Sequence, residues 1–136
     1  MITPEQYFHG KAHTPEQAAR CDELLLCVNS LLLEASQKGA YDYAVDIDTG
    51  TCISGSRGGS GDGGFRLSDS ATGAAKSSHK EARAVDVYDT FNKLDEWITD
   101  AVLFNHGLYR EHPSKTLGWV HLTTRAPASK RRTFYP

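Results

Sequence analysis

The sequence predicts an α+β fold in which helices pack against one face of a small antiparallel sheet. Residues 84–89 and 117–124 alternate apolar and polar side chains, as strands with one buried face do. Apolar residues recur at helical spacing through 15–38 and again through 90–105. These patterns, with a further short strand expected at 51–57, give a sheet and two packing helices.

Length and composition indicate one globular domain spanning residues 1–136. The chain has 136 residues, of which 39% are hydrophobic and 24% charged. Its net charge of −2 gives no electrostatic reason to expect a nucleic-acid partner. No apolar run approaches the ~20 residues of a membrane span, so no membrane insertion is expected. We expect a monomer, made in the cytoplasm because the N-terminus lacks a secretory signal pattern.

Two capping signals open the predicted N-terminal helices. Thr3-Pro4-Glu5-Gln6 and Thr14-Pro15-Glu16-Gln17 each place a capping Thr before Pro, with Gln three residues after the Thr. Gly10 ends a short first helix, and Gly39 ends the long second one. The long helix has a broad apolar stripe, which favours a role as scaffold.

The segment between the long helix and residue 77 is expected to be mostly turns and loops. Residues 41–45 and 51–54 have the composition of short strands joined by a turn. Residues 58–64 are glycine-rich, but no helix follows them, so a dinucleotide site is not indicated. The three cysteines form no C-x-x-C pair, and we expect all three to be reduced.

The predicted strands place polar residues on the face away from the helices. Val85 and Val87 would face the core, which turns Asp86 outward, and the same alternation turns His121 outward. If the two strands are neighbours, Asp86 and His121 share one face, and His79 lies in the loop that enters the first strand. Two imidazoles and one carboxylate, with a fourth position open, are typical of a catalytic Zn²⁺ site.

These residues also carry a family resemblance. Residues 77–86 follow the pattern Ser-x-His-x-x-Ala-x-Ala-x-Asp, which resembles the S-x-H-x-x-G-x-A-x-D signature of the zinc D-alanyl-D-alanine peptidases. That superfamily includes VanX-type dipeptidases, carboxypeptidases, phage L-alanyl-D-glutamate endolysins and, more distantly, hedgehog domains. Trp119-x-His121 is similar to the family's W/H-x-H element. The resemblance implies that His79, Asp86 and His121 are the zinc ligands.

The resemblance extends to substrate contacts. Residues 54–57, Ser-Gly-Ser-Arg, resemble the family's S-G-Y-R segment, which implies that Arg57 contacts the substrate. Ser77 would contact the substrate or steady the loop before His79. The implied substrate is a peptidoglycan stem peptide with D-amino acids. The small size and the missing signal suit a phage or prophage endolysin released to the wall by a holin.

Two positions depart from the family pattern. Ala82 replaces a glycine of the first motif, and Gly118 stands where relatives usually place the catalytic Glu or Asp, three residues before the last ligand. Glu111, in an expected loop over 108–116, is the candidate catalytic base, with His112 as second choice.

Two other interpretations remain open. The chain could keep the zinc but act as a catalytically impaired module that binds wall peptides or a protein partner, which Gly118 favours. Alternatively it could be a structural domain without metal. Four basic residues lie near the C-terminus: Arg125, Lys130, Arg131 and Arg132. Such a cluster is more typical of a solvated surface, although it could contact an anionic polymer.

Overall fold

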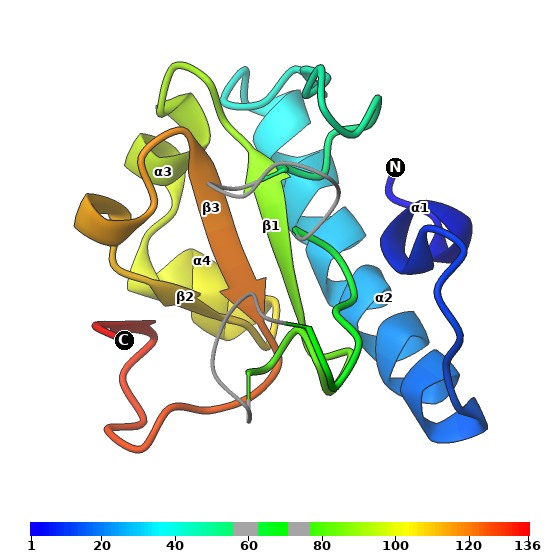
Figure 1. Cartoon of the computed structure of the whole chain (residues 1–136). Helices are drawn as coiled ribbons and strands as arrows, with labels where there is room; N and C mark the ends of the chain where they lie inside the picture. Colours follow the sequence, from blue (N-terminus) through cyan, green and yellow to red (C-terminus); the bar gives the residue numbers. More distant parts are fainter. Residues whose placement is uncertain (56–62, 71–76) are drawn as a thin grey trace.

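The chain has an α+β fold, with helices beside a four-stranded sheet of order β1-β3-β2-β4 (Figure 1). The computed structural model describes residues 1–55, 63–70 and 77–136. The helices are α1 (Pro4–Phe8), α2 (Pro15–Gln37), α3 (Lys93–Trp97), α4 (Asp100–Asn105) and the 3₁₀ turn η1 (Pro113–Lys115). The strands are β1 (Ala84–Tyr88), β2 (Tyr109–Glu111), β3 (Trp119–Thr123) and β4 (Thr133–Phe134).

The sheet is mixed, which corrects the expectation of an antiparallel one. β1 and β2 both pair antiparallel with β3, whereas β4 runs parallel to β2. Neither β2 nor β4 was predicted, because strands of three and two residues are too short to show alternation. The predicted core of the sheet, β1 beside β3, is confirmed.

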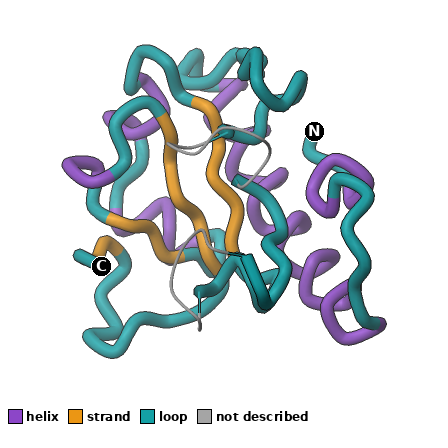
Figure 2. Tube along the Cα trace, in the orientation of Figure 1, coloured by secondary structure: helices purple, strands orange, loops and turns teal. Residues whose placement is uncertain are grey.

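Helix α2 covers one face of the sheet and contributes seven buried residues to the core. Figure 1 shows α2 and α4 behind β1 and β3. The apolar stripe of α2 is buried with the inward side chains of both strands, which include Val85, Val87, Val120 and Leu122. Each such buried aliphatic side chain stabilises the fold by about 1.5–3 kcal/mol. Among the described residues, no helix lies over the opposite face of the sheet in Figure 2.

Both N-terminal capping signals form as predicted. The side chains of Thr3 and Thr14 each accept a hydrogen bond from the backbone N–H of the Gln three residues later, and each Gln side-chain oxygen accepts one from the backbone N–H of its Thr. Helix α1 is tied to the sheet, because the buried Tyr7 hydroxyl donates to the carbonyl of Ala84 at 2.8 Å.

Two other predicted elements were wrong. The helix expected over 90–105 is interrupted, because Ile98 is extended and Thr99 caps a new helix by accepting from the backbone N–H of Val102. Residues 41–45 form no strand, and the described part of 51–57 forms only isolated bridges, Asp46 with Thr51 and Ile53 with Val87. In place of the expected hairpin there is a turn in which the Asp46 carboxylate accepts from the N–H of Asp48 and the Thr49 hydroxyl donates to the carbonyl of Ile53.

All three cysteines are free thiols, as expected, with Cys21 and Cys52 buried. Within the described ranges, no helix has the length and apolar character needed to cross a membrane.

Candidate metal centre

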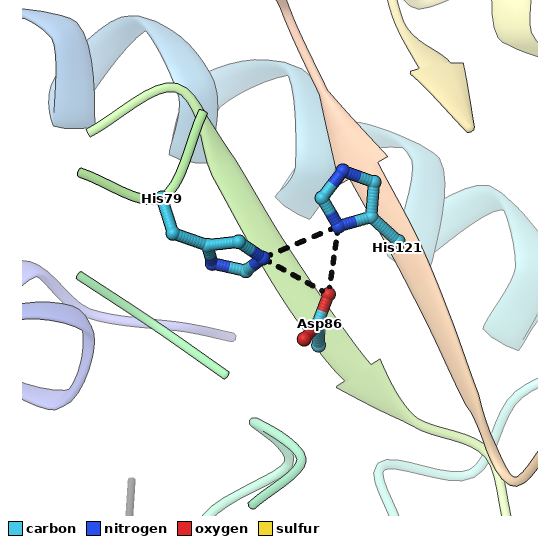
Figure 3. Close-up of side chains that lie close together, drawn as sticks. All are labelled: His79, Asp86 and His121. Atoms are coloured by element: carbon cyan, nitrogen blue, oxygen red, sulfur yellow. Dashed lines mark hydrogen bonds and ion pairs between the residues drawn. The ribbon is translucent and has the colours of Figure 1, made fainter. Parts of the chain in front are cut away.

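Three side chains meet on the sheet face away from α2. The register pairs Asp86 of β1 with His121 of β3, so both point to the same side, as their alternation with core residues predicted. His79 reaches the same point from the loop that precedes β1 (Figure 3). The His121 Nδ1 atom lies 2.9 Å from Asp86 Oδ1, and His79 Nε2 lies 3.3 Å from the same oxygen and 3.2 Å from His121 Nδ1.

The loop that carries His79 is built from successive tight turns. The Ser77 hydroxyl accepts a hydrogen bond from the backbone N–H of His79 at 3.3 Å, and the Ser77 carbonyl accepts from the N–H of Lys80. Ala82 closes the loop with a left-handed φ of 59°. Glycine takes this conformation without steric cost, whereas the Cβ of Ala82 adds backbone strain.

A backbone carbonyl fixes the ring of His79. Gly64 O lies 2.9 Å from His79 Nδ1, and because a carbonyl only accepts, Nδ1 carries the proton and Nε2 keeps its lone pair. Gly64 is itself held between elements, since the N–H of Phe65 donates to the carbonyl of Tyr7 in α1. Metal-binding histidines are commonly oriented by such a bond on the second nitrogen.

The electrostatics of the cluster favour a neutral His79 and an ionised Asp86. Burial lowers the pKa of His79, because a charged imidazolium would lose its water, although Asp86 opposes the shift. Burial alone would raise the pKa of Asp86, but the two histidines outweigh it and hold that pKa well below its usual range. The guanidinium of buried Arg66 lies 3.7 Å from the second carboxylate oxygen of Asp86.

The spacing of the three atoms suits a metal ion. Ligand atoms at the usual ~2.0–2.1 Å from a tetrahedral zinc lie ~3.3 Å from each other. The three observed separations, 2.9, 3.2 and 3.3 Å, are close to that value. His79, Asp86 and His121 therefore form a group that could hold a metal ion.

Glu111 lies in strand β2 rather than in the expected loop. The register pairs Arg110 with Leu122, which faces the core, so the neighbouring Glu111 points to the other face. One step further along this register places Glu111 beside His121. Cβ atoms of such neighbours lie ~4.5–5.5 Å apart, within reach of a glutamate side chain.

The other residues to which the sequence analysis gave a role lie outside the metal group or outside the described residues. Arg57 lies outside the described residues. His112 caps the 3₁₀ turn by accepting from the N–H of Ser114, and its ring stacks on Tyr135. Gly118 has a φ of 88°, a backbone conformation that a glutamate rarely adopts. Sequence analysis missed Arg66, which no motif marked.

Comparison with known proteins adds no relative. A scan against protein-family models found no match, and searches of curated proteins and of solved structures found none.

Proposed function

We propose that this protein is a zinc-dependent peptidase that hydrolyses D-amino-acid-containing bonds of bacterial peptidoglycan, as a phage or prophage endolysin. The observation that supports it most is the convergence of His79, Asp86 and His121 on one sheet face. The resemblance of residues 77–86 and 119–121 to the zinc D-alanyl-D-alanine peptidases gives the substrate class.

Zinc is the metal that we assign to this group. Two imidazole nitrogens and one carboxylate oxygen match a catalytic zinc site, which keeps its fourth position for water or substrate. The His121 side chain remains 13% exposed, whereas His79 and Asp86 are almost fully buried. The side of the group next to His121 is therefore the direction from which substrate would approach.

Glu111 is the general base in this proposal. A zinc ion held by His79, Asp86 and His121 would supply polarisation of the scissile carbonyl and activation of a water molecule. Glu111, on the same face as His121, would accept the proton of the attacking water and pass it to the leaving amine. A carboxylate on β2 would thus replace the one missing at Gly118.

Arginine would hold the carboxylate of the stem peptide. A guanidinium offers two parallel hydrogen bonds to a carboxylate, which makes it a strong anchor. The resemblance gives this role to Arg57, whereas the buried guanidinium of Arg66 already lies 3.7 Å from the Asp86 carboxylate. Ser77 holds the backbone of the loop before His79, which supports the steadying role proposed for it.

The metal is the first point to test. Elemental mass spectrometry of the wild type and Asp86→Ala should find about one zinc per chain, lost in the variant. Iron in place of zinc would contradict the assignment, because a site of two His and one carboxylate also suits non-haem iron. A wild type without metal, even after zinc is supplied, would remove the basis of the proposal.

Digestion of purified peptidoglycan tests the base. Glu111→Gln should retain zinc and lose roughly 10²–10⁴-fold in rate. Glu81→Gln is a matched control, since the Glu81 carboxylate forms ion pairs with Arg83 and Arg125 and takes no part in the metal group. If wild type and His79→Ala release equally few fragments, the peptidase proposal is wrong.

The second candidate is a binding module that retains the metal without cutting. The specific observation in its favour is Gly118, which occupies the usual place of the catalytic carboxylate. Zinc-loaded protein that sediments with peptidoglycan and releases no fragments would support this function over the first.

A further inference from the structure

A phenylalanine from the last strand packs against a ligand of the metal group. The ring centroids of Phe134 and His121 lie 6.3 Å apart, with the ring planes at 87°. Strand β4 pairs Phe134 with Glu111 of β2, so Phe134 points to the same face as Glu111 and His121. Phe134 is half-buried, and its ring packs beside the metal group.

The two histidines of the group are oriented in different ways. His79 has its second nitrogen fixed by the carbonyl of Gly64. For His121, both hydrogen bonds seen among the described residues involve Nδ1, the nitrogen that faces Asp86 and His79. Within that part of the chain, Nε2 of His121 therefore has no bond that would fix the ring from behind.

We propose that Phe134 is a positioning residue that keeps Nδ1 of His121 directed at the metal. Rotation of an imidazole about its Cβ–Cγ bond exchanges Nδ1 for a carbon atom, and this torsion is broad and roughly two-fold. A ring packed edge-on against the imidazole restricts that rotation. The inference rests on the proposed function only for the presence of a bound metal, not for peptide hydrolysis.

Strand β4 is anchored independently of the Phe134 ring. The N–H of His112 donates to the carbonyl of Phe134, and the Arg110 side chain donates to Thr133 Oγ1 at 3.2 Å. Arg110 is in turn held by a buried ion pair with Asp95, 3.3 Å away. Removal of the Phe134 ring should therefore leave β4 in place, so the variant isolates the ring's effect.

Cobalt(II) titration of the metal-free protein tests the proposal, since the visible spectrum of cobalt reports ligand geometry. Phe134→Ala should bind cobalt about tenfold more weakly than the wild type, and its visible spectrum should change. The expected loss is at the lower end of the effect of removing a residue that supports a metal ligand. Phe134→Tyr should restore both. Tyr135→Ala is the matched control, because Tyr135 is the adjacent aromatic, stacks on His112 and is 65% exposed.

The outcomes separate this inference from the proposed function. Unchanged affinity and spectrum in Phe134→Ala would overturn the inference alone, as would an equal loss in Tyr135→Ala, which would indicate a general loosening of β4. Cobalt binding by a wild type that digests no peptidoglycan would overturn only the peptidase proposal. A wild type that binds no cobalt would overturn both.

Discussion

Nδ1 of His79 donates to the carbonyl of Gly64, and Gly64 packs so closely on Tyr7 that a methyl group at Gly64 would lie 2.5 Å from the Tyr7 carbonyl oxygen. The Gly64→Ala change must therefore displace the carbonyl that orients His79. We expect zinc affinity to fall by about 10–100-fold, the usual effect of losing a partner of a metal-binding histidine. Competition with a chromophoric chelator measures this affinity.

Gly50→Ala is the control for general loss of stability. Gly50 has a left-handed φ of 68°, and a methyl group there would meet nothing within 4 Å. Its substitution should lower stability by about 1 kcal/mol without changing zinc affinity. Equal losses of affinity in both variants would show that the bond from Gly64 has no special role.

A carboxylate introduced at position 118, where the zinc D-alanyl-D-alanine peptidases that residues 77–86 resemble usually carry one, should not improve catalysis. Gly118 has a φ of 88°, and an added Cβ would meet nothing within 4 Å, so a side chain here costs only backbone strain. Gly118→Glu and Gly118→Ala should therefore each lower the free energy of unfolding by about 1 kcal/mol. Urea unfolding measures both. Peptidoglycan digestion by Gly118→Glu that exceeds the wild type would argue against Glu111 as the base.

The break between α3 and α4 gives a prediction about stability alone. Thr99 Oγ1 accepts the N–H of Val102 at 3.2 Å and begins a helix of six residues. Thr99→Ala should reduce the free energy of unfolding by about 1 kcal/mol, and Thr99→Ser by much less. Zinc affinity should not change, since Thr99 does not contact the metal group; a loss of affinity would show that α4 also positions the site.

The parts of the fold that sequence analysis predicted correctly are those with a repeating pattern. Helix α2 has several turns of apolar periodicity and a capping box, and β1 and β3 each alternate over five residues. The same alternation predicted that Asp86 and His121 share a face, which the register confirms. Elements of two or three residues, such as β2 and β4, carry no period that a sequence can reveal.

The rest of the candidate site depends on contacts that no side-chain pattern marks. Gly64 contacts His79 through its backbone carbonyl, so the residue type at position 64 does not predict this hydrogen bond. Arg66 and Phe134 reach the site through tertiary packing, from positions 13 residues away from the nearest ligand in the chain. In the sequence, Glu111 is distinguished only as the nearest acidic residue before Gly118, whereas the register of β2 puts its side chain on the same sheet face as His121.

The buried contact between Asp95 and Arg110 beside β4 should make stability depend on pH. Burial raises the pKa of Asp95 to about 7, although Arg110 opposes the shift and Asp89 adds to it. An unfolded Asp has a pKa of ~3.9, so folding takes up a proton between about pH 4 and about pH 7. This contribution to stability is complete below pH ~4 and is lost as the pH rises through about 7.

Asp95→Asn should remove that dependence. The melting temperature of the wild type minus that of the variant is expected to fall as the pH is raised from about 4.5 to about 8. The difference between the two proteins is the quantity to follow, because His79 and Asp86 contribute in both with the opposite sign. Asp22→Asn is the control, because it shows how much the melting temperature changes when one exposed carboxyl charge of α2 is removed. A difference that rises with pH would mean that Asp95 is ionised throughout, stabilised by Arg110 more than it is opposed by burial.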